Sequence, residues 1–364
     1  MKVGGKPYRT IWLDDDGESV VVIDQTRLPH AFAARTLLDA ADAADAIRTM
    51  IVRGAPLIGA TAAYGVAMAM RDDPSDGNLL RACDDLVATR PTAINLAWAV
   101  ARLRQPLLHA PRASRAELAY RLAAELCDED VAINEAIGDH GAAIFAARWR
   151  DLGETKPLTI LTHCNAGWLA TVDWGTALAP IYKLHDEGVP VHVFVDETRP
   201  RNQGAGLTAW ELKSHGVPFE LIVDNAGGHL MQQGEVDLCV VGTDRVTADG
   251  SVCNKIGTYL KALAARDNGV PFYVALPSPT IDWATDHGAD VPIEDRGARE
   301  VTHIWGRDAK GSRVEVALAP EGALARNPGF DVPPPRLVTG LITERGVAEA
   351  SKEGMQALFA AKAA

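Results

Sequence analysis

A carboxylate, an amide and an ammonium group lie within a dozen residues of one another in the second half of the sequence. They belong to the stretch Val240–Thr258, VVGTDRVTADGSVCNKIGT, in which an apolar run typical of a buried strand ends in Gly242-Thr243-Asp244. We expect Asp249-Gly250 to form a turn, and Asn254 and Lys255 to lead into a helix. Open α/β sheets bind ligands at the carboxyl ends of their central strands, which makes Asp244 a candidate acid–base group. Ordinary ion pairs also use such positions, so this stretch alone does not decide the matter.

Polar residues follow other predicted strands as well. The apolar runs 158–161, 191–195, 219–223, 238–241 and 272–276 alternate with helical patterns, which predicts a parallel sheet with crossover helices. Directly after the first run comes Thr162-His163-Cys164-Asn165, and after the second comes Asp196-Glu197-Thr198-Arg199. Because the carboxyl ends of parallel strands share one edge of a sheet, we expect these groups to converge on one pocket.

Cys164 differs from the other cysteines in its surroundings. Cysteines 83, 127 and 239 lie in apolar or helical patterns, where free thiols are usually buried and inert. Cys164 instead begins a turn ahead of a predicted helix, a setting in which thiols become reactive. In an extended backbone the adjacent His163 would point the other way, so we do not expect a Cys–His dyad.

Two loops in the first half of the chain are candidate anion sites. Arg53-Gly54-Ala55-Pro56 precedes an apolar helix, 57–70, whose free N–H groups would lie beside the arginine. Arg90-Pro91-Thr92 repeats the pattern, with Thr92 as the expected N-cap of the next helix. The alternative interpretation is two surface arginines near ordinary helix starts. In a later loop, Gln203 is a candidate for binding a substrate hydroxyl, whereas Thr208 and Glu211 have the spacing of a capping box.

Composition and pattern define the class of protein. The 364 residues carry a net charge of −12, which argues against a general nucleic-acid binder. The first residues, MKVGGKPYRT, lack the apolar core of a signal peptide, and the segment 57–70 is too short to span a bilayer. The five cysteines show no spacing of a zinc site or a disulfide framework, so we expect a cytoplasmic protein without a metal. No G-x-G-x-x-G follows the first strand, which counts against a dinucleotide site.

The secondary-structure pattern changes near residue 153, and we predict an α/β protein with a domain boundary there. Residues 1–152 are expected to form a mostly helical domain with a small β-hairpin, 10–13 paired with 19–23. Residues 153–364 are expected to carry the mainly parallel sheet and the catalytic site.

Taken in order, these motifs make the sequence resemble the methylthioribose-1-phosphate isomerase family of methionine salvage, which is related to regulatory subunits of a translation-initiation exchange factor. The resemblance covers nearly the whole chain. It rests on IDQTRLP, VRGAPLIGATAAYG, LTHCNAG, DETRPRNQGA, DNAGGHLM, GTDRV, NKIGTY, PIEDR and NPGFDV.

The resemblance implies a Rossmann-like second domain, a homodimer, a sugar-phosphate substrate and no metal or redox cofactor. It implies that Cys164 and Asp244 are the catalytic pair. The implied substrate-binding residues are Arg53, Gly54, Ala55, Arg90, Gln203, Asn254 and Lys255. Trp168 stands where a small residue is commoner in the family, and we expect it to reshape the pocket around the 5-substituent of the sugar.

Other functions remain open from the sequence alone. The substrate could be 5-deoxyribose 1-phosphate or ribose 1,5-bisphosphate, and the latter needs a second anion pocket. A non-enzymatic translation-factor subunit is the alternative from another class, although such a protein could lack the catalytic pair that this chain has.

Overall fold

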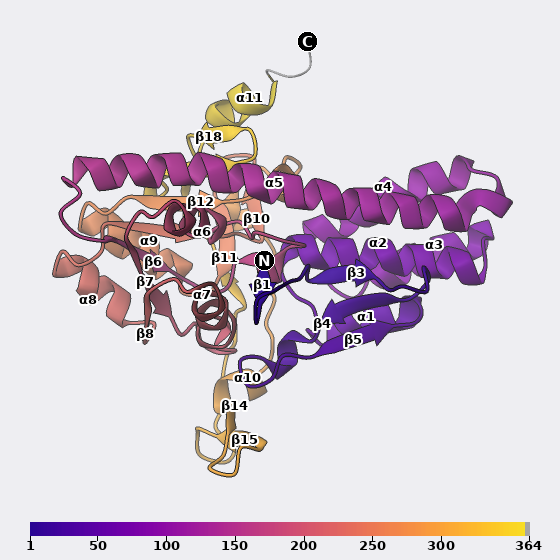
Figure 1. Ribbon diagram of the computed structural model, residues 1–364, viewed down its shortest axis with the longest axis horizontal. Coiled ribbons are helices and arrows are strands. Elements are labelled where there is room, and N and C mark those ends of the chain that lie inside the picture. Colours follow the sequence, from indigo (N-terminus) through magenta and orange to yellow (C-terminus); the bar gives the residue numbers. More distant parts are fainter. Residues whose placement is uncertain (361–364) are drawn as a thin grey trace.

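The computed structural model describes residues 1–360 and shows a helical half and a sheet half joined by one long helix, α5, Arg115–Asp151 (Figure 1). At ~1.5 Å per residue α5 is about 55 Å long. It packs on α2 in the helical half and on α6, Ala179–Asp186, in the sheet half. Because α5 belongs to both cores, the domain boundary at residue 152 stays a prediction. No helix among residues 1–360 is both long and apolar enough to cross a membrane.

The helical half is built around α2, Ala55–Asp72, in which every residue from Leu57 to Met70 is buried. Its many alanines and glycines let neighbouring helices approach closely. These neighbours are α1 (Ala40–Arg48), α3 (Asp76–Val87), α4 (Ile94–His109) and α5. An antiparallel sheet of β3 (Ile11–Leu13), β4 (Val20–Ile23) and β5 (Ala34–Leu37) contains the predicted hairpin, which is confirmed.

The second half is a seven-stranded sheet in the order β18-β17-β12-β9-β6-β7-β8. Its strands are β6 (Leu158–Thr162), β7 (Val191–Asp196), β8 (Phe219–Ile222), β9 (Leu238–Val241), β12 (Phe272–Ala275), β17 (Gly340–Thr343) and β18 (Gly346–Ala348). All neighbours pair in parallel except β17 and β18, so the five predicted parallel strands are confirmed and a sixth is added. In chain order the six parallel strands run 3-2-1-4-5-6, the order of a doubly wound Rossmann sheet.

Helices cover both faces of this sheet. Ile160 and Val193 point to one face, where they pack with α5 and α6. Leu161 and Phe194, one residue further along each strand, point to the opposite face and pack with α8, Ala226–Gln232, and α9, Thr258–Asp267. The continuous apolar runs of the sequence follow from this burial on two sides.

A second, smaller sheet continues from the end of β9. It has the order β13-β10-β11-β16, with β10 at Arg245–Thr247, β11 at Val252–Lys255, β13 at Ile281–Asp282 and β16 at Phe330–Asp331. The predicted turn at Asp249-Gly250 joins β10 to β11. The expected helix after Asn254 and Lys255 is confirmed as α9, which starts at Thr258, while Asn254 and Lys255 themselves end the strand β11.

Two other expected helix starts are wrong. Thr92 is not an N-cap, because α4 begins at Ile94 and the Thr92 carbonyl instead accepts a hydrogen bond of 2.7 Å from Arg245. The turn at Cys164 leads only into a three-residue 3₁₀ turn, Trp168–Ala170, and α6 begins later at Ala179.

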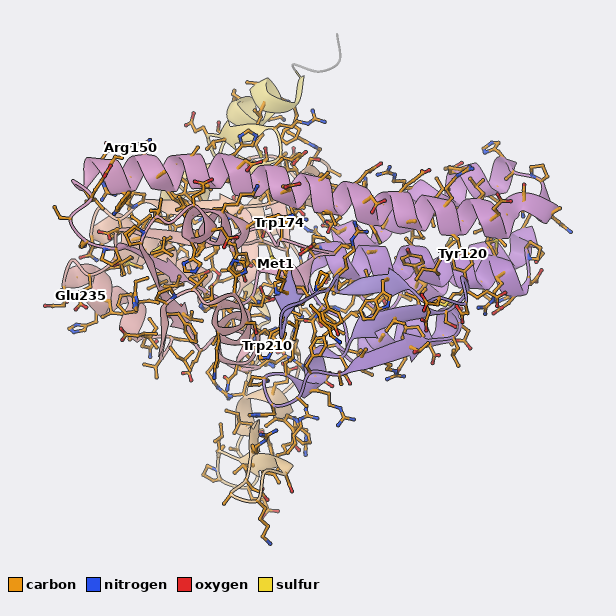
Figure 2. The ribbon with its side chains drawn as sticks, in the orientation of Figure 1. Met1, Tyr120, Arg150, Trp174, Trp210 and Glu235 are labelled. Atoms are coloured by element: carbon orange, nitrogen blue, oxygen red, sulfur yellow. The ribbon has the colours of Figure 1, made fainter. Side chains whose placement is uncertain are left out.

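Two further features complete the outline of the molecule. The helix α10 (Arg299–Thr302) and the hairpin of β14 (His303–Arg307) and β15 (Arg313–Ala317) extend away from the rest of the chain (Figure 1). The amino terminus is fixed between the two halves, since the Met1 ammonium lies 2.7 Å from the Asp173 carboxylate, and Met1 lies near Trp174 in Figure 2.

Candidate active site

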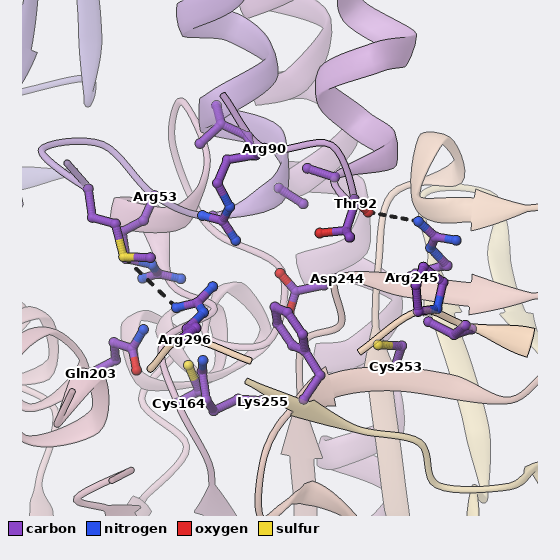
Figure 3. A pocket seen from close by; sticks show the side chains of 18 residues that line it. Arg53, Arg90, Thr92, Cys164, Gln203, Asp244, Arg245, Cys253, Lys255 and Arg296 are labelled. Atoms are coloured by element: carbon purple, nitrogen blue, oxygen red, sulfur yellow. Dashed lines mark hydrogen bonds between the residues drawn. The ribbon is translucent and has the colours of Figure 1, made fainter. Parts of the chain in front are cut away.

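A cavity lies where the loops of the helical half meet the carboxyl edge of the sheet (Figure 3). Of the nine residues predicted for the site, eight line it: Arg53, Gly54, Ala55, Arg90, Cys164, Gln203, Asp244 and Lys255. The cavity also contains Arg296 and Phe330. Residues separated by more than 200 positions in the sequence therefore share one small volume.

Cys164 and Asp244 follow β6 and β9, which lie side by side in the sheet. From β6 the chain winds toward β7 and β8, and from β9 it winds the other way toward β12 and β17. The gap between β6 and β9 is thus the topological switch point, where sheets of this type bind their ligands. Neither the Cys164 thiol nor the Asp244 carboxylate has a hydrogen-bond partner or an ion pair among residues 1–360. Both groups are therefore free to act on a ligand.

The two strand-end loops touch at a glycine. A Cβ on Gly242, which follows β9, would lie 2.5 Å from the Cβ of Ala166 in the loop after β6. No side chain fits there, because real Cβ contacts are longer than 3.0 Å. Gly242 therefore lets the loop of Cys164 and the loop of Asp244 approach each other closely.

The backbone at Cys164 is held in an unusual conformation. Its φ angle is +67°, a left-handed value that is uncommon for residues other than glycine. The Cys164 N–H donates to the Thr198 hydroxyl at 2.8 Å, and the Cys164 carbonyl accepts from the Thr208 hydroxyl at 2.6 Å. These two bonds fix the direction in which the thiol points.

Glu211 is the second support of this loop. Its carboxylate accepts from the Asn165 side chain at 2.8 Å, from the N–H groups of Trp168 and Leu169 at 3.0 and 3.1 Å, and from the Tyr182 hydroxyl at 2.7 Å. Complete burial raises the pKa of the Glu211 carboxyl, although these donors act in the opposite direction.

Two expectations from the sequence are corrected here. The predicted capping box is wrong, because Thr208, although it is the N-cap residue of α7 (Ala209–His215), makes no side-chain cap hydrogen bond. The side chains of Thr208 and Glu211 instead hold the loop of Cys164. The predicted effect of Trp168 on the pocket is also wrong. Its side chain is 1% exposed in the core, 6.1 Å from Trp210, and does not line the cavity.

The loop before α2 forms the opposite wall. Gly54 has a φ of +96°, and a Cβ there would lie 2.3 Å from the carbonyl oxygen of Ala170, so only glycine fits. The first turn of α2 has no side-chain cap, which leaves N–H groups free beside the cavity. Arg53 donates from Nη1 and Nη2 to the side chain and the carbonyl of Asn165, at 2.5 and 2.7 Å.

Three further cations surround the cavity. Burial lowers the pKa of Lys255 to about 8, and the nearby charge of Arg296 contributes to this shift. Lys255 and Arg296 lie 5.0 and 5.3 Å from the ring centre of Phe330. Arg90 enters from the helical half (Figure 3). A pocket this rich in positive charge, with Asp244 as its acidic residue, is suited to a small anionic ligand.

Asn254 is the predicted residue that does not reach the cavity. Side chains alternate along a strand, and its neighbours Cys253 and Lys255 both line the cavity. The Asn254 side chain therefore points to the other side, where it donates to the Thr258 hydroxyl at 3.0 Å. Gln203 does reach the cavity, and its Oε1 atom is buried without a partner among the described residues.

Arg296 was missed because a lone arginine in a loop carries no local signal. The motif PIEDR, which contributed to the family resemblance, contains it. The signal that could have found Arg296 is therefore this motif, because a motif that carries the family resemblance is a candidate for ligand binding.

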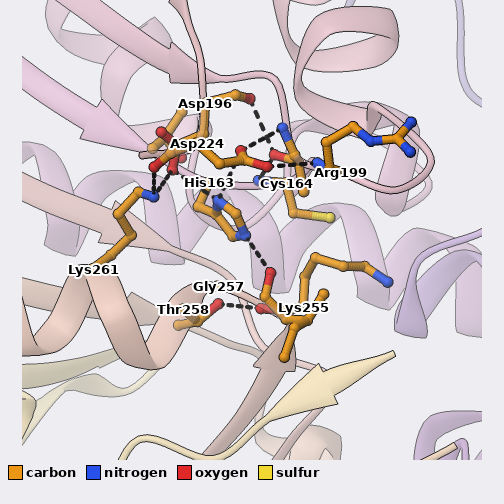
Figure 4. A network of polar contacts seen from close by, with 12 residues as sticks. His163, Cys164, Asp196, Arg199, Asp224, Lys255, Gly257, Thr258 and Lys261 are labelled. Atoms are coloured by element: carbon orange, nitrogen blue, oxygen red, sulfur yellow. Dashed lines mark hydrogen bonds and ion pairs between the residues drawn. The ribbon is translucent and has the colours of Figure 1, made fainter. Parts of the chain in front are cut away.

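A buried polar network lies behind Cys164 (Figure 4). His163 is held between the Asp196 carboxylate and the Ile256 carbonyl, at 2.8 and 2.9 Å. Both ring nitrogens are thus occupied, which agrees with the prediction that His163 and Cys164 do not form a dyad. His163, Asp196 and Asp224 are close enough to bind one metal ion, but the Lys261 ammonium already lies 3.0 Å from Asp196. This lysine supplies the positive charge that the carboxylate needs.

Known proteins are similar to this chain in sequence and in fold. The profile of the Initiation factor 2 subunit family matches residues 51–350. The chain belongs to this family. A protein of Rhodospirillum rubrum named methylthioribose-1-phosphate isomerase is 61% identical, with 100% of this chain and 94% of the relative aligned.

Solved structures support the same placement. The 5-methylthioribose 1-phosphate isomerase of Pyrococcus horikoshii OT3 is similar with a TM-score of 0.82 and 38% identity, covering 98% of this chain and 96% of that one. A structure described as translation initiation factor eIF-2B, subunit delta, from A. fulgidus has a TM-score of 0.80 and 38% identity, covering 97% and 100%. Within the family, the chain is thus similar over its full length to proteins of two different descriptions.

Proposed function

We infer that this protein is an aldose–ketose isomerase that converts 5-methylthioribose 1-phosphate to 5-methylthioribulose 1-phosphate in methionine salvage. The sequence identity of 61% over the whole chain supports this reaction. The observation in the structure that carries the proposal is a thiol and a carboxylate, Cys164 and Asp244, facing one cavity lined with cations. Isomerisation needs proton transfer beside a fixed phosphate. This cavity offers a thiol and a carboxylate for the proton transfer and several cations for the phosphate.

The chemistry follows from the substrate. Its phosphate sits on the anomeric oxygen and blocks the spontaneous ring opening of a free sugar. We assign Asp244 as the acid that protonates the ring oxygen while the bond from that oxygen to carbon 1 breaks. Cys164, as thiolate, removes the proton on carbon 2, which gives an enol phosphate. The Cys164 thiol then returns that proton to carbon 1 while the Asp244 carboxylate takes the hydroxyl proton on carbon 2, which completes the ketose and restores both groups.

The remaining residues of the cavity bind and orient. Arg90, Lys255 and the free N–H groups before α2 attract the phosphate, and Gln203 has an unused carbonyl for a sugar hydroxyl. The contacts of Arg53 with Asn165 give it a further role, since they tie the phosphate wall to the loop of Cys164. Asn254 would act indirectly, through Thr258.

The test is an isomerase assay on the purified protein without added cofactor, with methylthio, deoxy and phosphate tails at carbon 5. We expect turnover that is fastest with the methylthio substrate. Cys164→Ser and Asp244→Asn should each remove at least about 10³-fold of kcat while substrate binding persists. Cys83→Ser, a buried thiol outside the cavity, is the matched control and should keep its activity. A near-normal rate in either cavity variant would refute the assigned roles.

Deuterium at carbon 2 tests the proton route separately. Because a thiol exchanges its hydrogen with water, part of the label should appear in solvent during turnover. Complete retention of deuterium in the ketose would favour a direct hydride shift and would end the role given to Cys164.

The similarity to the structure described as a translation-factor subunit favours one second candidate, a regulatory subunit of such a complex. That function does not need a free thiol and carboxylate in one cavity. Co-purification with a translation factor, together with no isomerase turnover, would favour it.

We also propose a homodimer in the cytoplasm. The support for the cytoplasm is that all five cysteines are free and buried, as in a reducing compartment. Light scattering after size-exclusion chromatography gives the assembly mass, and a monomer at micromolar concentration would contradict the dimer.

A further inference from the structure

One acidic side chain lies between two arginines of the cavity. Glu294 Oε2 is 3.5 Å from Nη2 of Arg90 and 3.4 Å from Nη2 of Arg296. We propose that Arg90 and Arg296 form a phosphate clamp, and that Glu294 occupies it as an internal anion which the phosphate of the substrate displaces. The proposal rests on the proposed function, because it names the residues that hold the phosphate of that substrate.

Both arginines have an N–H donor that makes no hydrogen bond to the described residues. The Nε atoms of both are buried, and neither has a hydrogen-bond partner among residues 1–360. The side chains are only 14% and 7% exposed, so solvent replaces these bonds poorly. A buried N–H donor without an acceptor is unfavourable, because it has lost its bonds to water and gained none in the protein. Because Arg90 and Arg296 extend toward each other in the cavity, one incoming anion can serve both (Figure 3).

Glu294 is a poor partner for this pair. Its contacts of 3.4 and 3.5 Å are longer than those of the paired arginine Arg245, whose Nη1 lies 2.9 Å from Asp282. Charge-assisted N–H···O bonds of full strength are about 2.7–2.9 Å long. The Glu294 side chain is also 32% exposed, so its carboxylate can turn into water with little loss of solvation.

The charges around Arg90 point the same way. Burial lowers the pKa of the Arg90 guanidinium, and the positive charge of Arg296 lowers it further, while Glu294 and Asp244 act in the opposite direction. Two buried cations close together thus repel each other unless an anion lies between them. A phosphate dianion brings more charge and three terminal oxygens, so it satisfies both guanidinium groups better than one carboxylate does.

Arg296 is placed for this role by its surroundings. Its guanidinium lies over the ring of Phe330, and its backbone N–H donates to the Asn327 carbonyl at 3.0 Å. The Glu294 carbonyl accepts from the Gly329 N–H at 2.8 Å. The backbone of both residues is therefore anchored on the 327–330 loop, so the Glu294 side chain can leave while Arg296 stays. Arg53, in contrast, is already bonded twice to Asn165.

Calorimetric titration with inorganic phosphate, at low salt in a buffer without competing anions, tests the clamp. We expect Arg296→Met to weaken phosphate binding at least about tenfold. Glu294→Gln should tighten it about three- to tenfold, because a neutral amide competes less. In the double variant Glu294→Gln/Arg296→Met, the gain in phosphate affinity from Glu294→Gln should be smaller than in the single variant, because Glu294 acts through Arg296. The KM for the sugar phosphate should move in the same directions.

Glu129→Gln is the matched control, since it removes one charge from an ion pair with Arg102, and neither residue lines the cavity. It should leave phosphate affinity unchanged. A gain of affinity in Glu294→Gln cannot come from misfolding, so that variant keeps the test decisive if Arg296→Met is unstable. Unchanged or weaker binding in Glu294→Gln, unchanged binding in Arg296→Met, or no phosphate binding to the wild-type protein would overturn the clamp.

The two proposals fail separately. Phosphate affinities that shift as expected, without turnover of any sugar phosphate, would refute the proposed reaction and leave the clamp intact. Turnover of the methylthio substrate with phosphate affinities that do not respond to these variants would refute the clamp alone.

Discussion

The support of the Cys164 loop by Glu211 gives a prediction that can be worked out atom by atom. In Glu211→Gln the side chain keeps its shape, but one carboxylate oxygen becomes an NH₂ group. Oε1 accepts from Asn165 and Leu169, and Oε2 accepts from Trp168 and Tyr182. An NH₂ group at Oε1 would face two donors, because Asn165 is fixed by Arg53 and cannot turn. At Oε2 it faces one fixed donor, the Trp168 N–H, while the Tyr182 hydroxyl can rotate to accept.

The second orientation is the less costly, and it still leaves one buried N–H group unpaired. That group costs about 1–3 kcal/mol, and the bonds that remain lose the strength that the charge gave them. Replacing the buried carboxylate with a neutral amide offsets part of this loss of stability, since burial disfavours the ionised form of Glu211. We therefore expect Glu211→Gln to lower the free energy of unfolding by about 2–4 kcal/mol. We also expect kcat to fall, because the loop that directs the Cys164 thiol loosens.

Urea denaturation followed by circular dichroism measures the stability, and the isomerase assay measures kcat. Glu220→Gln is the matched control, because Glu220 is 68% exposed and, within residues 1–360, forms an ion pair only with His192. It should change stability by no more than about 0.5 kcal/mol. A loss below about 1 kcal/mol in Glu211→Gln, with kcat unchanged, would show that this carboxylate does not hold the loop.

Three other variants test separate parts of the structure. Because burial lowers the pKa of Lys255 to about 8, its ammonium form is lost above that pH, and kcat/KM should fall about fivefold from pH 8 to pH 9. Lys255→Arg should flatten that decline, and a flat wild-type profile would contradict it. Burial raises the pKa of Asp130 to about 7, so its protonated form favours folding and that contribution is lost as the pH rises from about 4 to 7. Asp130→Asn removes this titration and can still accept from the Val172 N–H. We therefore expect it to stabilise the protein by about 1–3 kcal/mol at pH 8 and by less at pH 5. A loss of stability at pH 8, measured by urea denaturation, would contradict this expectation. Gly54→Ala should lower stability by at least about 2 kcal/mol and raise KM, whereas Gly77→Ala, with open space around it, should be neutral or slightly stabilising in the same measurements.

The sequence alone predicted the strands and helices that depend on local pattern. The five apolar runs became parallel strands, and the polar residues after two of them, Cys164 and Asp244, lie at one cavity as expected. Such predictions succeed because an apolar run buried on two faces and a polar residue at its end are properties of neighbouring residues. Asn254 and Lys255 show the limit of this approach. The helix that they were expected to lead into does follow, at Thr258, but pairing with β10, which the local pattern did not reveal, makes the two residues themselves part of a strand.

Only the tertiary structure decided which side chains support the site and which fill it. Thr208 and Glu211 have capping-box spacing, yet contacts with residues more than 40 positions away bring both to the loop of Cys164. Arg296 and Glu294 reach Arg90 across about 200 residues, and no local pattern encodes that meeting. Hydrogen bonds and ion pairs act over a few ångströms in space, whatever the separation along the chain. The residue types were therefore fixed by the sequence, and the partners that give them a role were fixed by the fold.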